Sequence, residues 1–305
     1  MRSGVILPNI GAGVGPEELV HAAQRAEELG YANLWVPERL LYPLAPRSPY
    51  PVTPDGSLPP YYKHALTPVE TLTYVASQTR RIGLGMSVLL MPLHNPVLLA
   101  RQIATLDVLS GGRVRLGLGQ GWSRDELEAG GGTAGQRGAR ADEYVAVLKA
   151  IWTTDPAEFQ GQYFTLPRSI LQPKPLQRPH PPIYMAAYVP SALRRVARHT
   201  DGWMPSGVPL AAVGPLMEQV RQEARTVGRD PDALELLVWA FVTVQDRPAG
   251  EGRPDFVGTW DEIRRDVETA RQLGASEIVF MPGYGTGELS LETYFRLLEP
   301  LRQLV

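Results

Sequence analysis

The sequence predicts an α/β fold, and within that class a (β/α)8 barrel, also called a TIM barrel. Short apolar runs alternate with amphipathic segments along the whole chain, which is typical of parallel strands joined by helices. Eight strand–helix units can be counted in the 305 residues, and eight such units are enough to close a parallel sheet into a barrel. We therefore expect one domain over residues 1–305, with segments of about 40–65 and 123–182 inserted at the carboxyl rim of the strands.

The elements follow one another in a regular order. The expected strands lie at residues 4–7, 33–36, 81–90, 114–118, 183–187, 202–204, 234–244 and 277–281. The expected helices lie at residues 16–29, 67–78, 95–110, 141–152, 191–199, 210–227, 259–273 and 290–301. Pro16 and Pro96 suit a first helical turn, and Thr67 and Thr259 each precede a glutamate at capping-box spacing.

Composition excludes several classes of protein. The net charge of −2 gives no electrostatic footprint for nucleic acid or for an acidic membrane. The absence of cysteine excludes disulfides, thiolate metal sites and a cysteine nucleophile. No apolar run is long enough to span a bilayer, and the N-terminus is too short and broken for a signal peptide. We expect a cytoplasmic protein that acts on a small molecule and binds neither nucleic acid nor membrane.

The stretch RVRLGLGQGW, residues 113–122, raises the central question of the sequence. Gly117, Gly119 and Gly121 alternate, but neither register gives the G-x-G-x-x-G spacing of a dinucleotide-binding turn. Alternate glycines remove the side chains from one face of a strand. Two interpretations remain open, namely that a planar ring approaches this backbone or that the barrel packs tightly here.

Other chemistries have weaker support in the sequence. Residues 85–89 fail the G-x-S-x-G pattern at its last position. The five histidines show no metal-ligand spacing, so we expect no metal site. Convergence of Glu38, Asp125 and Glu126 as paired carboxylates stays open. In a barrel the site lies at the carboxyl ends of the strands, here at residues 8–9, 38–39, 87–90, 119–125, 187–191, 205–207, 241–243 and 282–284.

Three long stretches resemble the luciferase-like flavin and deazaflavin oxidoreductases. They are RRIGLGMSVLLMPLHNPVLLARQIATLDVLSGGRVRLGLGQGW, GQRGARADEYVAVLKAIW and YMAAYVPSALRRVARHTDGWMPSG. Taken together, the chain looks most similar to the branch that uses coenzyme F420. The resemblance implies a (β/α)8 barrel that binds F420, or alternatively FMN, at the carboxyl rim, and we expect a homodimer.

The resemblance also implies roles for particular residues around the ring. Ser87 and Val88 match a non-prolyl cis peptide that bulges behind the deazaflavin, unless they form an ordinary strand end. Glu38 and Arg39 stand where many members carry Asp-His, so a His-based proton transfer is in doubt; they could also form a rim salt bridge. Trp122 stands where some members carry a glutamic acid. Its indole either borders the substrate side of the pocket or packs in the core. The ring edge is expected near Gly119, Gly121 and Trp122.

Two further segments match the part of the family site that holds the cofactor's phosphate and side chain. Ala187, Tyr188, Val189 and Ser191 match a loop that is usually glycine-rich and leads into a helix, whose free N–H groups attract phosphate. Ser206 would complete this pocket. Asp125 stands where a polar residue can bond the cofactor's side chain, or it caps the next helix.

These implications predict an oxidoreductase that moves hydride between F420 and an organic substrate. The alternatives are an FMN-dependent monooxygenase of the same family and a cofactor-free barrel that only binds a ligand. We expect residues 40–65 to fold over the strand ends as part of the pocket wall. We also expect Gly121→Val to weaken cofactor binding while leaving the apo protein almost as stable.

Overall fold

The computed structural model describes residues 1–53, 55–132, 135–283 and 290–305. These residues form a closed barrel of eight parallel strands, in the order β9–β11–β1–β2–β3–β4–β7–β8, and β8 pairs back with β9 to complete the circle. This confirms the predicted fold. The barrel strands are β1 (Arg2–Ile6), β2 (Asn33–Val36), β3 (Gly83–Leu90), β4 (Val114–Gly119), β7 (Ile183–Met185), β8 (Gly202–Trp203), β9 (Glu235–Val244) and β11 (Glu277–Pro282).

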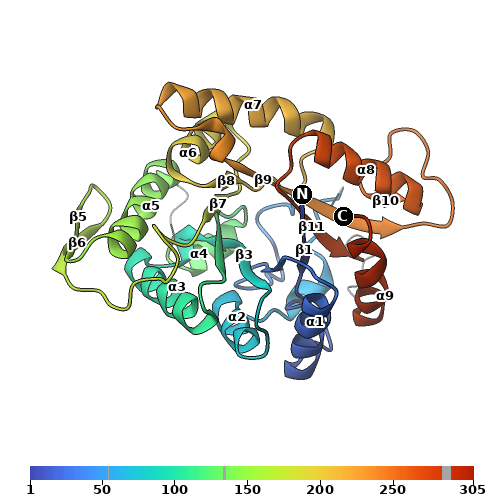
Figure 1. Cartoon of the computed structure of the whole chain (residues 1–305), viewed down its shortest axis with the longest axis horizontal. Helices are drawn as coiled ribbons and strands as arrows, with labels where there is room; N and C mark the ends of the chain where they lie inside the picture. Colours follow the sequence, from blue (N-terminus) through green and yellow to red (C-terminus); the bar gives the residue numbers. More distant parts are fainter. Residues whose placement is uncertain (54, 133–134, 284–289) are drawn as a thin grey trace.

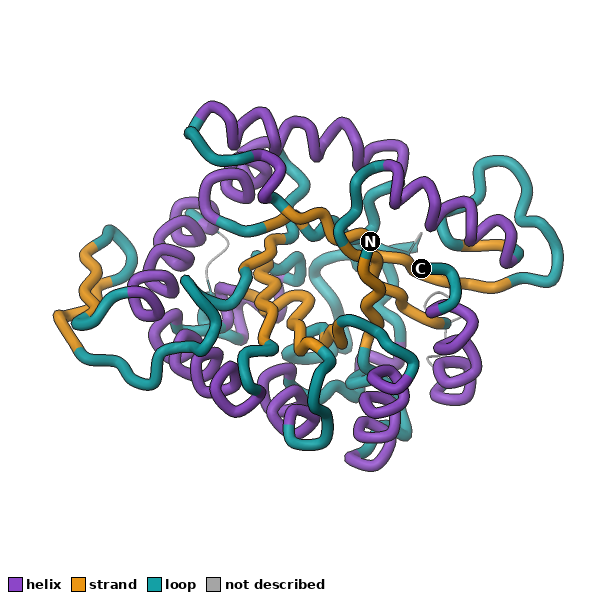
Figure 2. The backbone as a smooth tube through the Cα atoms, viewed as in Figure 1, coloured by secondary structure: helices purple, strands orange, loops and turns teal. Residues whose placement is uncertain are grey.

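Helices surround these strands as an outer ring (Figures 1 and 2). Their apolar faces and the outward side chains of the strands form one large hydrophobic core. The helices of the ring are α1 (Pro16–Glu28), α2 (Pro68–Ala76), α3 (Pro96–Ser110), α5 (Arg137–Thr153), α6 (Pro190–His199), α7 (Leu210–Thr226), α8 (Trp260–Gln272) and α9 (Leu291–Arg302). The predicted capping box forms at Thr259, whereas the Thr67 side chain makes no cap hydrogen bond.

The insertions contain short elements that the sequence did not predict. The second insertion includes α4 (Arg124–Ala129) and an antiparallel hairpin of β5 (Ala157–Gln160) and β6 (Thr165–Ser169), which projects from the barrel in Figure 2. The first insertion holds the 3-10 turn η1 (Pro60–Lys63), and η2 (Met91–Leu93) follows β3. The remaining short elements are η3 (Pro231–Ala233) and β10 (Val257–Gly258), which extends β9.

The interior of the barrel is filled near the amino ends of the strands. Trp35 of β2 is fully buried there, and glycines take the neighbouring inward positions on both adjacent strands. A Cβ atom on Gly4 would overlap the Glu277 carboxylate, and one on Gly85 would overlap the Trp35 ring. This pairing of one large side chain with small neighbours fills the interior around Trp35.

Glu277 holds this interior layer together. Its carboxylate accepts hydrogen bonds from Trp35 Nε1 and Asn33 Nδ2, each at 2.7 Å, and lies 3.5 Å from Arg2 Nε. The side chain is fully buried. Burial raises the pKa of Glu277, while the two hydrogen bonds and the nearby arginines oppose that rise. Because Glu277, Arg2 and Trp35 belong to β11, β1 and β2, one carboxylate joins three adjacent strands.

Among the described residues, we find no helix that combines the length and the apolar character needed to cross a bilayer.

The close fit around Trp35 makes a prediction about Gly85. Gly85→Ala should lower the free energy of unfolding by about 1–3 kcal/mol, because the new methyl group overlaps a fully packed indole. Gly135→Ala is the matched control, since no described atom lies within 4 Å of a Cβ built there. Urea denaturation of both variants measures the difference, and equal stability of the two would show that the interior tolerates the methyl group.

Candidate functional site

A large cavity opens at the carboxyl ends of the barrel strands. Its volume is about 580 Å³, which is within the range of small-molecule and cofactor sites. It brings together eleven of the thirteen residues predicted as the site, namely Glu38, Arg39, Ser87, Val88, Gly119, Gly121, Trp122, Ala187, Tyr188, Val189 and Ser206. Asp125 and Ser191 are not among its lining residues.

The first insertion folds over this rim as predicted. Tyr50, Val52 and Tyr62 line the cavity, and the Tyr50 and Tyr62 hydroxyls lie 2.8 Å apart in a hydrogen bond. Ile10 pairs with Ala65 in a short antiparallel bridge, which ties the end of the insertion to the loop after β1. The insertion therefore supplies an aromatic wall to the cavity.

The cavity floor includes the end of β3. The peptide between Ser87 and Val88 is cis, as the family resemblance implied, and the pairing of β3 with β4 shifts register between Met86 and Leu89. Ser87 Oγ is buried and has no hydrogen-bond partner among the described residues. A buried hydroxyl without a partner is unusual in proteins, so this lining residue leaves a polar group to be satisfied.

The three alternating glycines have separate structural causes. A Cβ on Gly117 would overlap the Met86 carbonyl oxygen, and one on Gly119 would overlap the Val88 side chain. Gly121 has a φ of +72°, which side-chain-bearing residues rarely adopt. Close packing therefore accounts for Gly117 and Gly119. Valine at position 121 would strain the apo fold itself, so the expectation of an almost unchanged apo stability was wrong.

Arg39 stands at the centre of the aromatic wall. Its guanidinium carbon lies 5.0 Å from the ring centroids of both Tyr62 and Trp122, and Nη1 lies 3.1 Å from Glu126 Oε2. Only 7% of the Arg39 side chain and 1% of the Glu126 side chain are exposed. The charge of Arg39 is therefore neutralised inside the protein, and cation–π contacts hold the two rings in place.

Glu126 also holds the beginning of the first insertion. Its Oε1 accepts hydrogen bonds from the backbone N–H of Leu40 at 2.7 Å and of Leu41 at 3.3 Å. Burial raises the pKa of Glu126, and Arg39 and these two N–H groups act against the rise. The predicted rim salt bridge of Arg39 is thus present, with Glu126 as its partner.

Glu38 pairs with His94, a residue that the sequence analysis did not assign to the site. Glu38 Oε2 accepts the backbone N–H of Leu90 at 2.7 Å, and Oε1 lies 2.7 Å from His94 Nε2. His94 follows β3 directly before the first turn of α3. The position of His94 after a strand could have placed it in the site from the sequence, because strand ends converge at the rim.

Asp125 binds the first insertion instead of lining the cavity. Its carboxylate accepts hydrogen bonds from the backbone N–H of Arg47 at 2.9 Å and from Arg47 Nε at 2.7 Å. The cap of α4 is Ser123, whose hydroxyl accepts the backbone N–H of Glu126. Neither interpretation offered for Asp125 from the sequence describes this contact, which fixes the insertion against α4.

The segment expected at the phosphate borders the opposite part of the cavity. Val189 is the N-cap residue of α6 and makes no side-chain cap hydrogen bond, and Ser191 lies exposed in the first turn. Ser206 and Gly207 line the cavity beside Tyr188 and Val189. The Tyr188 residue keeps 52% of its surface exposed.

The end of β9 adds two residues to the cavity lining. Phe241 falls in one of the rim segments expected from the sequence, and Trp239 was not predicted. Trp239 and Phe241 both line the cavity, with ring centroids 6.4 Å apart. They are two positions apart on one strand and therefore share a face. Residue 284, in the last expected rim segment, lies outside the described residues.

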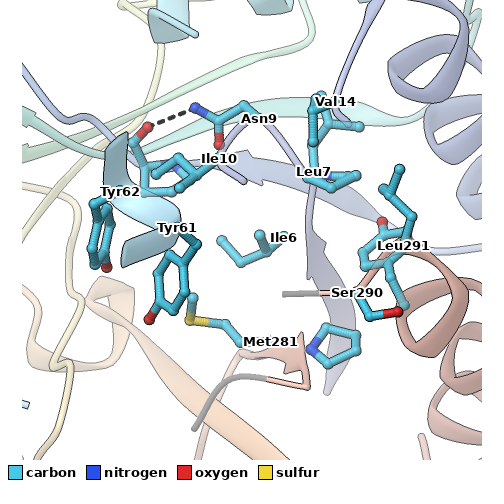
Figure 3. Close-up of a pocket in the computed structure, with 14 residues that line it drawn as sticks. Ile6, Leu7, Asn9, Ile10, Val14, Tyr61, Tyr62, Met281, Ser290 and Leu291 are labelled. Carbon is cyan, nitrogen blue, oxygen red and sulfur yellow. Dashed lines mark hydrogen bonds between the residues drawn. The ribbon is translucent and has the colours of Figure 1, made fainter. Parts of the chain in front are cut away.

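A second, smaller cavity lies beside the first. Its volume is about 40 Å³, and Figure 3 shows Tyr61 and Met281 on one side of it and Leu7, Val14 and Leu291 on the other. Asn9 at its edge donates hydrogen bonds to the carbonyl oxygens of Pro37 at 3.0 Å and Leu66 at 2.8 Å. These bonds join the loop after β1 to both ends of the first insertion.

Comparison with known proteins places this barrel and its rim in a family. Residues 1–250 match the family model described as luciferase-like monooxygenase. The chain belongs to the luciferase-like monooxygenase family. An uncharacterized protein of Mycobacterium bovis is 33% identical over 284 residues, which cover 92% of this chain and 91% of that protein.

Two relatives with named activities differ in their cofactor. An F420-dependent glucose-6-phosphate dehydrogenase of Amycolatopsis mediterranei is 32% identical over 62% of this chain and 53% of that protein. An FMNH2-dependent dimethylsulfone monooxygenase of Pseudomonas putida is 32% identical over 50% of this chain and 42% of that protein.

Two solved structures share the fold at lower identity. A monooxygenase from Streptomyces bottropensis superposes with a TM-score of 0.79 at 22% identity, over 100% of this chain and 98% of that one. An F420-dependent secondary alcohol dehydrogenase, solved with an F420–acetone adduct, gives 0.77 at 16% identity, also over 100% and 98%.

The residues present fit a flat aromatic cofactor of the flavin type. The cavity has the volume for such a group, aromatic walls for a ring and one buried hydroxyl, Ser87 Oγ, that lacks a partner among the described residues. Among the described residues no cluster of three or more His, Asp or Glu side chains could hold a metal ion.

The buried Glu126 carboxylate makes a prediction about the stability of the wall. Glu126→Ala should lower the free energy of unfolding by about 3–5 kcal/mol, because it leaves the Arg39 charge buried without its partner. Urea denaturation measures the loss.

Glu128→Ala is the matched control on the same helix. Glu128 pairs with Arg47 and Arg124 at the surface, where ion pairs contribute little. We expect this variant to unfold almost as the wild type does. A comparable loss in both variants would contradict the role given to the Arg39–Glu126 pair.

Proposed function

We propose that the protein transfers hydride between the deazaflavin coenzyme F420 and a small organic substrate. The observation that carries the proposal is the single cavity that gathers eleven of the predicted site residues at the carboxyl rim. The F420-dependent relative supports the choice of cofactor, since it matches a larger share of this chain than the FMNH2-dependent relative at the same identity. When bound, the deazaflavin would supply the carbon centre that accepts or donates the hydride.

In this proposal the protein's main task is to hold the ring and exclude water. Ser87, Val88 and Gly119 form the surface against which a ring would rest, and Ser87 Oγ can bond a ring heteroatom. Tyr62, Trp122 and the β9 aromatics Trp239 and Phe241 enclose the substrate side. Such a wall favours an apolar substrate body and keeps the reacting carbon away from bulk water.

The proton that accompanies hydride transfer requires a titratable group near the cavity. Arg39 keeps its charge at all ordinary pH values, and Trp122 has no acidic proton to give. Glu38 lines the cavity and shares a contact of 2.7 Å with His94. We assign to this pair the role of holding the proton, with Glu38 Oε1 as the atom that exchanges it with His94 Nε2.

The N-terminus of α6 is the proposed phosphate site. The first N–H groups of a helix lack internal partners, and the helix dipole adds positive potential there. Val189 contributes no side-chain cap to these groups, and Ser206 lines the same cavity as Val189. The second candidate function, FMN-dependent oxygenation, uses the same site and is favoured by the Pseudomonas relative.

Cofactor binding tests the proposal and separates the two candidates. Purified protein should bind F420 with micromolar affinity or better, and FMN at least tenfold more weakly, which corresponds to about 1.4 kcal/mol. Fluorescence quenching of each cofactor on titration with protein measures both constants. Tighter binding of FMN would favour the oxygenase, and no binding of either would leave a barrel that only binds a ligand.

The phosphate site makes a separate prediction. Ser191→Asp should weaken F420 binding at least tenfold, because it places a negative charge in the first turn of α6. Ser169→Asp on the β5–β6 hairpin is the matched control and should bind as the wild type does. An unchanged dissociation constant for Ser191→Asp at low salt would show that the phosphate binds elsewhere.

A further inference from the structure

A third cavity, of about 360 Å³, lies next to the large one and shares Gln120 and Arg137 with it. It is enclosed by the loop after β3, by residues 130–132 and by the first turns of α5. The predicted site residues do not line it. Its ionisable lining residues are His94, Arg137, Arg140 and Tyr144, and none of its lining residues is Asp or Glu.

The two arginines of this cavity lack acidic partners. Arg137 Nη1 donates to the Gly121 carbonyl oxygen at 2.9 Å, and the guanidinium of Arg140 lies over the rings of Tyr163 and Phe164, 5.3 and 5.2 Å from their centroids. Within the described residues neither forms an ion pair. Glu143 on α5 interacts electrostatically with Arg140 but forms no ion pair with it, and its carboxylate accepts the backbone N–H groups of residues 162–164.

The N-terminus of α5 adds to the positive potential. Its N-cap residue, Gln136, makes no side-chain cap hydrogen bond, and the first turn contains no acidic residue. Two arginines at the positive end of a helix of 17 residues are electrostatically unfavourable unless an anion lies near them. Positive charge thus gathers at one wall of the cavity, while Glu143 acts on Arg140 from α5 and Glu38 acts on Tyr144 from outside the lining.

Tyr144 provides an independent sign of a missing ligand. It lies on the second turn of α5 and lines the cavity, its side chain is buried with 2% exposure, and its hydroxyl has no hydrogen-bond partner among the described residues. Burying a hydroxyl without a partner costs free energy. His94 lines the same cavity, and its Nε2 atom contacts Glu38.

We propose that this cavity binds an oxyanion, a phosphate or carboxylate group, between Arg137, Arg140 and the N-terminus of α5. The planar guanidinium groups suit such oxygen atoms. Because the cavity adjoins the large one, the oxyanion belongs either to the substrate or to the cofactor. The inference does not rest on the identity of the cofactor, since Arg137, Arg140 and Tyr144 have no part in the proposed hydride chemistry.

Equilibrium dialysis with radiolabelled inorganic phosphate tests the site in the apo protein. Arg140→Gln should weaken phosphate binding at least tenfold, and Arg140→Lys should keep it within a few-fold because the charge remains. Tyr144→Phe should weaken it by a smaller factor without lowering stability, since the hydroxyl has no other described partner. Arg168→Gln, an exposed arginine of β6, is the matched control and should bind as the wild type does.

The α6 site could also take inorganic phosphate, so Ser191→Asp belongs in the same series. Phosphate binding that survives in Ser191→Asp and is lost in Arg140→Gln supports the proposal. Binding that is lost in Ser191→Asp and unchanged in Arg140→Gln overturns it, as does an absence of phosphate binding in the wild type. Circular dichroism of Arg140→Gln confirms that the variant is folded.

The source of the oxyanion is found by repeating the F420 titration with Arg140→Gln. At least tenfold weaker F420 binding assigns the oxyanion to the cofactor. Unchanged F420 binding, together with phosphate binding to the F420-loaded wild type, assigns it to the substrate. If F420 does not bind at all, the proposed function fails while the phosphate series still decides the present inference.

Discussion

The hydrogen bond from the Trp35 indole to the buried Glu277 carboxylate determines where this barrel can hold a ligand. It fixes the fully buried Trp35 indole inside the barrel, beside the first residue of β11. Gly4 and Gly85 make room for it, and Asn33 and Arg2 complete the polar contacts of Glu277. The large cavity lies beyond this packed layer, at the carboxyl ends of the strands. The position of the large cavity is therefore a consequence of packing.

A second buried carboxylate organises the open end. Glu126 binds Arg39 and the backbone of Leu40 and Leu41, so it positions both the aromatic wall and the start of the first insertion. Arg39 therefore has a structural role in the wall. The proton chemistry that we propose rests instead on the contact between Glu38 and His94.

The fold could be predicted from the sequence because its signals are local and repeated. Alternating apolar strands and capped helices require no knowledge of distant contacts, and the eight barrel strands lie within a few residues of the expected bounds. The cavity residues were predictable for the same reason, since the carboxyl ends of parallel strands meet at one rim. The family resemblance added the cis peptide at Ser87, which no local pattern in the chain specifies.

What the sequence did not reveal depends on contacts between distant segments. Asp125 binds Arg47 across 78 positions of the chain, and no motif marks such a pair. The glycines of β4 were ambiguous because Cβ space depends on Met86 and Val88 of the neighbouring strand. Arg137, Arg140 and Tyr144 look like an ordinary amphipathic helix in the sequence. Only the folded chain shows that Arg137 and Arg140 face a cavity without acidic partners among the described residues.

The most direct test of the account is a crystal structure of the protein with F420. We predict that the deazaflavin ring rests against Ser87 and Val88. Trp122 and Trp239 would lie on the substrate side, and the phosphate at the first turn of α6. A ring bound outside the large cavity, or bound within it but away from the Ser87–Val88 peptide, would contradict the central claim that this rim is built to hold the cofactor.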